Sequence, residues 1–435
     1  MNSEVMLLGD EGMEESTQSK QSLFQNKIFA RMYLAYATAT FGDWFDALAI
    51  QVLVGYRWQA SPFMLALIPV VMALPGVLLG SVAGVIADRL NKLRLMRMCD
   101  LFMMFLTLFI LFAPNIGWLL LLLGLRAAIS TVNIPAQQSM TRSIVREDQL
   151  LQATSLNGVV NQGSKIAGPL LGAVALTILT PQWCVFINGV MRGVSYLLLL
   201  TIKNSHKDTI GSASQTADQS DSILAMLTEG WKFIIRKQVL LNTMLFGITG
   251  ALVIQMIDFQ FTSLFRNIAP HNEALLGWMV AASGVGAICI IWAMNKWSSV
   301  MSGTWRLGLS YVLLGVSIAG LGLLAPNSSI FWILILGVIL GIGNGMFFVT
   351  FNYNLQKETP SHMTGRVFGI QSTVMGVIML TAPLIGGALV QFAGPALIFV
   401  QLGVVLSILG LVGLLFKRFL WRDRATPSMD HVSSS

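Results

Sequence analysis

The chain has 435 residues, of which 55% are hydrophobic and 11% charged, and its mean hydropathy is +0.71. Soluble domains carry roughly 25% charged residues, so this composition excludes a soluble globular enzyme and a disordered chain. The net charge of +7 is spread between long apolar runs, which excludes a nucleic-acid-binding surface. Because many of these runs approach the ~20 residues needed to cross a bilayer, the sequence predicts an all-α polytopic membrane protein embedded in lipid.

Hydropathy and turn signals divide the chain into two sets of six spans. Residues 1–27 are rich in acidic residues, unlike a secretory signal, and are expected to form a cytoplasmic tail. The first bundle is predicted over 28–202, a cytoplasmic linker with an amphipathic helix from Ile223 over 203–238, the second bundle over 239–416 and a tail over 417–435. The expected spans are 28–55, 62–87, 95–113, 117–139, 151–178 and 183–202, then 239–265, 273–294, 305–324, 330–353, 365–390 and 395–416.

The basic residues predict the orientation. Of the 27 Lys and Arg residues, only Arg57 and Arg266 fall in loops expected outside the cell, and three more fall within spans. All others lie in the loops and tails that share a side with the two termini. By the positive-inside rule, both termini are therefore expected in the cytoplasm.

The two halves also repeat. The segment Gly168–Ala173 (GPLLGA) aligns with Ala382–Gly387 (APLIGG) at corresponding places in the two sets of spans. A six-plus-six repeat is typical of secondary transporters, in which two bundles rock around a central site. The sequence contains no GxxxxGK[ST] motif for an ATP-driven pump. The scattered cysteines and histidines indicate neither a disulfide nor a metal site, and no cofactor or catalytic arrangement is expected.

Three motifs resemble those of the major facilitator superfamily. After the second span, the segment Gly84–Arg94 resembles the loop signature G-x-x-x-D-R-x-G-R-[KR], with Asn91 in place of the later glycine. The fourth span has Arg126 at a position of the family's R-x-x-x-G stretch, and the fifth has a GPLLG element like that of the antiporter branch. The resemblance implies two pseudo-symmetric six-helix bundles and transport by alternating access.

Further motifs are similar to those of one drug:proton antiporter subgroup. They are Phe41-Gly42-Asp43, Leu74-Pro75, Leu227–Trp231 and Thr364–Gly369. This subgroup includes macrolide efflux pumps, the enterobactin exporter and lysophospholipid transporters. The resemblance implies a monomeric multi-pass protein of the bacterial inner membrane that exports small amphiphilic molecules in exchange for protons.

Three acidic residues are candidates for proton coupling. Asp43 and Asp46 lie three residues apart in the first span, on one helical face, and Asp258 lies in the corresponding seventh span. A carboxylate removed from water holds a proton more readily, so such a group can alternate between the protonated and the ionised state. Asp43 is the leading candidate, and Arg126 is assigned to coupling through the family resemblance. Structural ion pairing is the alternative role for each of them.

The candidate cargo contacts are charged and polar residues within the spans, where hydrocarbon would penalise them. Lys165 and Arg192 could meet an anionic or zwitterionic cargo, or could simply neutralise the aspartates. The remaining candidates are Trp44, Asn157, Asn161, Gln162 and Asn344.

The family resemblance also assigns gating residues. Asp88 is expected to contact the positive N-terminal end of the eleventh span and to hold the cytoplasmic side closed. Glycine and proline in the fifth span allow close packing and bending. The full gating set is Gly84, Asp88, Arg89, Lys92, Arg94, Gly168, Pro169, Gly172, Gly365 and Arg366.

Three functions therefore remain open from the sequence. The leading one is proton-coupled efflux of amphiphilic compounds such as macrolide-like drugs. The second is export of a siderophore or handling of a lysophospholipid, and the third is a membrane sensor or scaffold that does not transport.

Overall fold

The computed structural model describes residues 23–202, 223–270, 272, 274–296, 305–360 and 363–416. In this part of the chain every regular element is helical, which confirms the predicted all-α fold. The first half of the chain forms α2 (Lys27–Val52), α3 (Pro62–Arg89), α4 (Lys92–Ile110), α5 (Ile116–Ile144), α6 (Leu150–Leu176) and α7 (Pro181–Leu200). A π-helical segment, η2 (Leu53–Arg57), extends α2, and short 3₁₀ turns η1 (Leu23–Gln25) and η3 (Glu147–Gln149) precede α2 and α6.

The second half begins with α8 (Ile223–Arg236). The next span is broken into α9 (Gln238–Ile257), the 3₁₀ turn η4 (Asp258–Gln260) and α10 (Phe261–Ile268). It is followed by α11 (Ala274–Lys296), α12 (Trp305–Gly322), α13 (Ile330–Glu358), α14 (Thr364–Ala393) and α15 (Pro395–Leu415). The predicted linker residues 203–222 and both predicted tails, apart from Leu23–Lys27, lie outside the described residues.

Nine helical stretches among the described residues are long and apolar enough to cross a membrane. The remaining bundle helices are α2, α4 and α6, which complete two sets of six. These three are the more polar ones: α2 contains Asp43 and Asp46, and α4 begins with several basic residues and contains Asp100. A hydropathy threshold thus misses helices whose polar groups face the protein interior instead of lipid.

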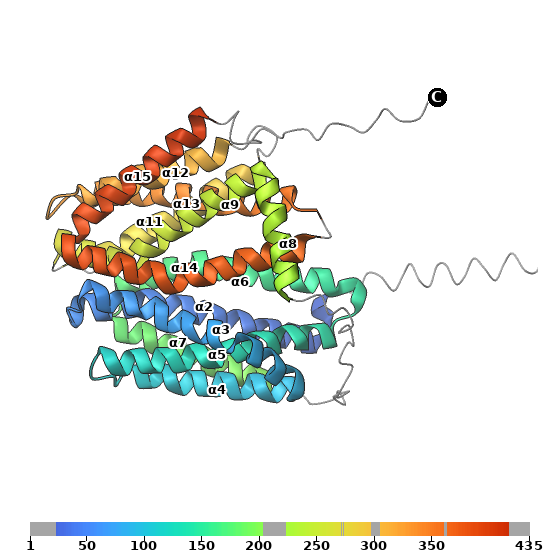
Figure 1. Ribbon diagram of the computed structural model, residues 1–435. Coiled ribbons are helices and arrows are strands. Elements are labelled where there is room, and N and C mark those ends of the chain that lie inside the picture. Colours follow the sequence, from blue (N-terminus) through green and yellow to red (C-terminus); the bar gives the residue numbers. More distant parts are fainter. Residues whose placement is uncertain are drawn as a thin grey trace, which may run out of the picture.

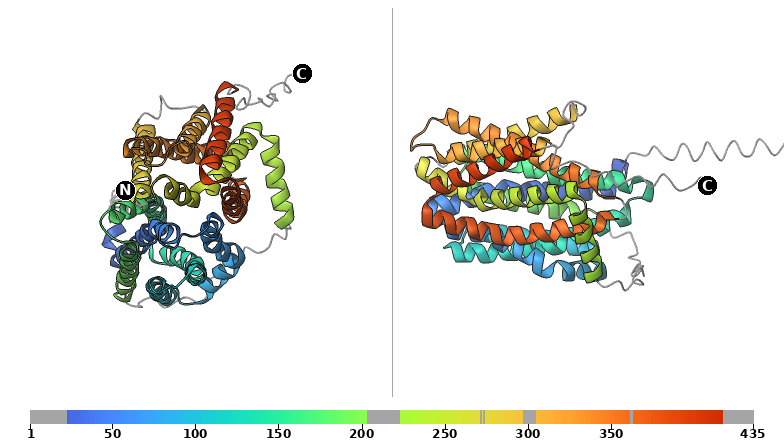
Figure 2. Two further views of the ribbon diagram at one scale, coloured as in Figure 1. Left: turned by 90° about the vertical axis from the view of Figure 1, so that its left-hand side faces the viewer. Right: turned by 45° about the horizontal axis from the view of Figure 1, so that its top comes forward.

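The two halves form separate bundles that lie side by side (Figure 1). Helices α2–α7 fill the lower half of that view and α9–α15 the upper half, and the end-on view separates the same two groups (Figure 2). Contacts between the bundles run through α3 with α14 and through α6 with α11. Since α11 is the counterpart of α3, and α14 of α6, these two contacts are equivalent under a pseudo-two-fold axis.

Glycines bring neighbouring helices into close contact within each bundle. A Cβ on Gly172 of α6 would lie 2.6 Å from the carbonyl oxygen of Phe45 in α2, and one on Gly168 would collide with Trp44. In the second bundle, a Cβ on Gly341 would collide with the backbone at Ser283. Without a hydrophobic driving force between helices in lipid, such close backbone packing is a main source of association.

Helix α8 lies across the ends of the second bundle (Figure 1). It occupies the segment where the sequence predicts an amphipathic helix, and it packs against α14 and α9. The Arg366 guanidinium of α14 forms an ion pair of 2.6 Å with Glu229 of α8, and Gly230 lies against Arg366 and Ile370. Lys237, between α8 and α9, pairs with Glu358 at the end of α13 at 2.8 Å. The linker helix is therefore attached to the second bundle at the start of α14 and beside the end of α13.

The bundles are sealed together at the end where α2 stops and α3 begins. Arg266 of α10 donates hydrogen bonds of 3.0 Å to the carbonyl oxygens of both Gly55 and Ala60. Gln260 of η4 donates to the carbonyl oxygen of Pro62 at 2.9 Å, and a Cβ on Gly387 of α14 would lie 3.0 Å from the same oxygen. We call this end of the molecule the closed end.

The opposite end of the interface is open. At six glycines in this half of α3, α6 and α14, an added Cβ would meet no neighbouring atom within 4 Å: Gly80, Gly84, Gly158, Gly163, Gly365 and Gly369. The counterparts of these residues at the closed end, such as Gly172 and Gly387, are tightly packed. The structure is thus open toward the end that carries the α3–α4 loop, and we call this the open end.

The packing at Gly172 predicts a difference between two substitutions that each add one methyl group. Gly172→Ala places a carbon against the Phe45 carbonyl and should lower the free energy of unfolding by about 1–3 kcal/mol. Gly158→Ala faces open space and should leave stability unchanged or raise it slightly, because alanine favours helix. Thermal unfolding of the purified variants in detergent measures the difference. Equal melting temperatures would contradict the close contact between α2 and α6.

The contacts of Arg266 predict a shift in conformation. Arg266→Gln removes hydrogen bonds that exist only while the closed end is sealed, so this end should open more often. At this seal, Thr262 of α10 donates a hydrogen bond of 3.4 Å to Gln51 of α2. A single cysteine introduced in place of Gln51 should then react faster with a maleimide reagent. Arg142→Gln, on an exposed arginine of α5, is the matched control. An unchanged reaction rate in Arg266→Gln would show that these bonds do not hold the seal.

Candidate functional site

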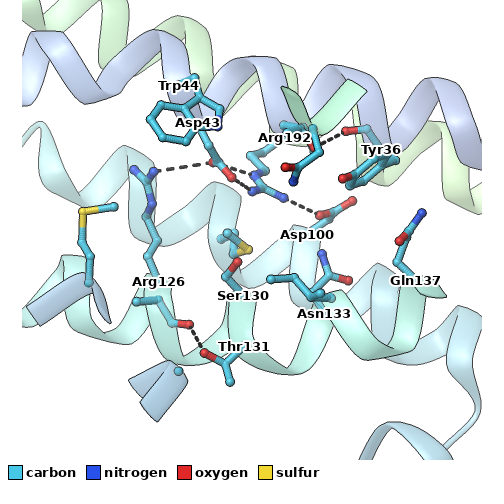
Figure 3. Close-up of a pocket in the computed structure, with 18 of the residues that line it drawn as sticks. Tyr36, Asp43, Trp44, Asp100, Arg126, Ser130, Thr131, Asn133, Gln137 and Arg192 are labelled. Carbon is cyan, nitrogen blue, oxygen red and sulfur yellow. Dashed lines mark hydrogen bonds and ion pairs between the residues drawn. The ribbon is translucent and has the colours of Figure 1, made fainter. Parts of the chain in front are cut away.

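A cavity of about 530 Å³ lies within the first bundle (Figure 3). Its walls come from α2 to α7, and Gly376 and Met379 of α14 close one side. The apolar lining includes four methionines, Leu123 and Ile134, together with Trp44 of α2. The polar lining is formed by Tyr36, Thr40, Asp43, Asp100, Arg126, Ser130, Thr131, Asn133, Gln137, Asn161, Arg192 and Ser195. The cavity therefore combines a flexible apolar wall with one wall that is strongly charged.

Asp43 and Asp46 reach this wall from the same face of α2. Asp46 is fully buried, and its Oδ2 accepts a hydrogen bond of 2.7 Å from Asn188 of α7. The preceding Gly42 makes room for this contact, since a Cβ there would lie 2.5 Å from the Asn188 side-chain oxygen. The Phe-Gly-Asp motif thus has a steric explanation: glycine admits the α7 amide beside the two carboxylates.

Two buried arginines connect the carboxylates. Arg126 of α5 forms an ion pair of 2.7 Å with Asp46 and lies 3.5 Å from Asp43. Arg192 of α7 forms an ion pair with Asp43 through one edge of its guanidinium and one of 2.9 Å with Asp100 of α4 through the other. Figure 3 shows Asp43 between the two guanidiniums. The network therefore ties together four helices: α2, α4, α5 and α7.

Asp100 is the member of the network that the sequence analysis missed. It is 3% exposed, and its second oxygen accepts a hydrogen bond of 2.5 Å from the Ser195 hydroxyl. A signal was present in the sequence, because Asp100 falls on one helical stripe with apolar residues. That stripe is Leu93, Met96, Asp100, Met103, Thr107 and Ile110, all of them buried. An acidic residue at a buried position of an apolar stripe needs a buried partner.

One face of α7 supplies the partners of the two buried carboxylates. Asn188, Arg192 and Ser195 are spaced four and three residues apart and are all buried. Asn188 donates to Asp46, Arg192 bridges Asp43 and Asp100, and Ser195 donates to Asp100. Asp46 and Asp100 each contact one arginine and one neutral hydrogen-bond donor. Among the contacts described, Asp43 has only the two arginines as partners.

Exposure also separates Asp43 from the other two carboxylates. The side chain of Asp43 is 30% exposed and lines the cavity, whereas those of Asp46 and Asp100 are 1% and 4% exposed. The described network contains three carboxylates and two guanidiniums, so one carboxylate exceeds the number of cations. Asp43 is the most exposed of the three toward the cavity, which Asp100 also lines.

The other predicted polar contacts are distributed over the protein. Asn161 lines the cavity, while the amide nitrogen of Asn157 lies 3.4 Å from the hydroxyl of Thr141 in α5. Asn344 is exposed on α13 and does not belong to the cavity lining. Asp258 is exposed in η4, where α9 breaks, and lies outside the network formed by Asp43 and Asp46. The structure therefore gathers Asp43, Asp46, Arg126 and Arg192 but not Asp258.

Several predicted residues fall on side chains that the structure does not describe. They are Asp88, Gln162, Lys165 and Pro169. Near Asp88, Arg89 and Arg94 are exposed at the open end and Lys92 is half-buried. Asn91, which replaces the glycine of the loop signature, caps α4 by accepting a hydrogen bond of 2.9 Å from the Arg94 backbone. Gly84 and Gly365 face open space at the same end.

Sequence comparison finds relatives over nearly the whole chain. The uncharacterised MFS-type transporter YfiS of Bacillus subtilis (strain 168) is 27% identical over 92% of this chain and 95% of its own. The multidrug efflux pump Tap of Mycolicibacterium fortuitum is 23% identical over 86% of this chain and 93% of its own. The multi-drug resistance efflux pump PmrA homologue of Lactococcus lactis is 24% identical over 78% and 82%.

Solved structures share the fold at low sequence identity. A bacterial homologue of the human lysosomal transporter Spinster, in an inward-facing and occupied conformation, aligns with a TM-score of 0.68 and 14% identity. The alignment covers 94% of this chain and 100% of that one. The nucleoside transporter NupG aligns with a TM-score of 0.66 and 11% identity over 90% and 99% of the two chains. The family model of the Major Facilitator Superfamily matches residues 32–380, and this chain is a multi-pass membrane transporter of that superfamily.

Proposed function

We propose that this transporter exports amphiphilic small molecules across the bacterial inner membrane in exchange for protons, with Asp43 as the proton carrier. The observation that carries the proposal is the cavity wall, where Asp43 is the most exposed of three carboxylates that face only two guanidiniums. Asp46, Arg126 and Arg192 support it as fixed charges. Asp258 is retained as a secondary candidate because it lies in a broken helix of the second bundle.

Charge balance explains why a proton on Asp43 is tolerated. When Asp43 is protonated, the ion pairs Arg126–Asp46 and Arg192–Asp100 remain in the buried wall. Each pair has no net charge. When Asp43 is ionised, the wall carries one uncompensated negative charge. A buried unpaired charge is costly, so the ionised state favours either a proton or a cationic group of the cargo at this place.

The cavity supports an amphiphilic cargo. Its volume lies in the range of roughly 300–1,000 Å³ that is typical of pockets for drug-sized molecules. Methionine side chains are flexible and polarisable, and they suit surfaces that accept ligands of varied shape. The printed names of Tap and the PmrA homologue as multidrug efflux pumps agree with this cargo class. Trp44 and Asn161 are the predicted cargo contacts that line this space.

The alternative cargo, a siderophore or a lysophospholipid, would need unpaired cations for its anionic groups. Arg126 and Arg192 are both engaged by carboxylates, which favours a neutral or cationic cargo over an anionic one. Lys165 keeps this alternative open, since its side chain is not described. A sensor or scaffold without transport would have no use for a cavity that contains an accessible carboxylate.

For the transport cycle we propose that the open end is cytoplasmic, as the distribution of basic residues predicts. The described conformation would then be the one that loads cargo from the cytoplasm. Closing that end would bring α3 and α14 together around Gly84 and Gly365. Asp88 would meet the start of α14, and Arg366, which holds α8, would move with it.

A panel of labelled compounds tests the function. In inverted vesicles with an imposed proton gradient, erythromycin, enterobactin and lysophosphatidylethanolamine represent the three cargo classes. We expect gradient-dependent uptake of the macrolide, and exclusive uptake of enterobactin or of lysophosphatidylethanolamine would select the alternative. Absence of gradient-driven uptake of every amphiphile in an extended panel would contradict the proposed transport.

The role of Asp43 predicts the effect of neutralising it. Asp43→Asn should abolish cargo accumulation against a gradient and retain cargo binding, because the carrier of the proton is lost while the cavity persists. Asp148→Asn, which removes an exposed carboxylate paired with Arg146, is the matched control and should transport normally. If Asp43→Asn still concentrates cargo with full dependence on the proton gradient, Asp43 is not the carrier.

A further inference from the structure

We propose that Asp100 is a positioning residue of the proton exchange: it holds Arg192 in place when Asp43 takes up the proton, and so sets the pH at which Asp43 exchanges. This inference rests on the proposed role of Asp43 and deepens it by assigning a buried acid in another helix. Its basis is the geometry around Arg192, whose guanidinium contacts carboxylates on both of its edges.

The first step of the argument is that Arg192 cannot stay charged without a carboxylate. Its side chain is 4% exposed, so water does not solvate it. One partner, Asp43, is the group that becomes neutral during exchange. The other partner, Asp100, is as buried as Arg192 itself and is fixed by the Ser195 hydroxyl at 2.5 Å. Asp100 therefore remains as the partner of Arg192 throughout the exchange.

The second step is the charge count without Asp100. Asp43 and Asp46 would then face Arg126 and Arg192, and the wall would be balanced only while Asp43 is ionised. Protonating Asp43 would leave a buried guanidinium unpaired, which is strongly unfavourable. Protonation of Asp43 would consequently be less favourable than in the unmodified protein, and the exchange would be impaired.

The surroundings contain few other charges that bear on this balance. Arg192 of α7 contacts both Asp100 and Asp43. Arg126 of α5 contacts Asp43 from its other side, and Asp46 shares α2 with Asp43. Cys99 neighbours Asp100 on α4 itself and is buried. Helix α6 carries Lys165 as its single charged residue, and the side chain of Lys165 is not described.

The test is an infrared titration of purified protein in lipid, which needs no cargo. The carbonyl band of a protonated carboxylic acid reports Asp43, assigned by its loss in Asp43→Asn. Asp100→Asn should move the midpoint of this band to lower pH by about 1 unit or more, since an opposite charge nearby shifts a carboxyl group by that amount. Arg192→Gln should move it to higher pH. Ser195→Ala, which leaves Asp100 charged but less fixed, should give a smaller shift than Asp100→Asn.

The double variant Asp100→Asn with Arg192→Gln separates positioning from a general effect on folding. It removes one negative and one positive charge, so Asp43 again becomes the surplus carboxylate beside the Arg126–Asp46 pair. We expect its midpoint to return to within about half a unit of the unmodified protein, because the two single substitutions shift it in opposite directions and together restore the original charge balance. A general loss of folding gives no reason for the two single substitutions to shift the midpoint in opposite directions. Variants that fail to fold would lose the band and the monodisperse elution together.

The outcomes distinguish this inference from the function on which it rests. If the band persists in Asp43→Asn, the proposed carrier is wrong. If the band belongs to Asp43 but Asp100→Asn leaves its midpoint unchanged, or the double variant does not restore it, the role of Asp100 is overturned and the carrier stands.

Discussion

The organisation of the first bundle depends on one buried constraint: two arginines in a water-poor interior must each have a carboxylate. Arg126 and Arg192 enter from α5 and α7, and the carboxylates that neutralise them come from α2 and α4. Removing either arginine would leave a buried carboxylate without its partner, which costs several kcal/mol. The network therefore fixes the relative positions of four helices, and it places the accessible Asp43 against the cavity.

The second bundle has the same helical order but is packed by different means. Its helices α12 and α15 meet through glycines at which a Cβ would collide with backbone or lie within 3.0 Å of it, including Gly315, Gly403 and Gly410. Tyr311, Phe347 and Phe351 form a chain of ring contacts in its core. The two bundles thus share a fold but differ in what holds their helices together. The described charge network lies in the first bundle, while close backbone packing stiffens the second.

These two properties fit a rocking motion around the cavity. A stiff second bundle can move as a unit. The described contacts between the bundles at the closed end include hydrogen bonds to backbone carbonyl oxygens, a hydrogen bond from Thr262 to Gln51 and close glycine contacts. Breaking these contacts separates no ion pair, because the partners of Arg266 are neutral carbonyl oxygens. The glycines of α3, α6 and α14 at the open end leave smooth helix surfaces that could meet when that end closes. The mobile interface and the ionised network are therefore kept apart.

The sequence alone determined the class of the protein, because long apolar runs admit little besides membrane helices and because charge asymmetry and the internal repeat are properties of the chain. It also identified Asp43, Asp46, Arg126 and Arg192 as costly charges that must serve some purpose. It could not pair them, since ion pairs between helices depend on which helices are neighbours and on how each is rotated. The apolar stripe of α4 indicated that Asp100 is buried, but only the packing of α4 against α7 places it beside Arg192. Conversely, the repeat placed Asp258 near the symmetry position of Asp43, and the break in α9 leaves it away from the network. The tertiary structure decided these points because burial and distance, which make a charge functional, are set by contacts between residues far apart in the chain.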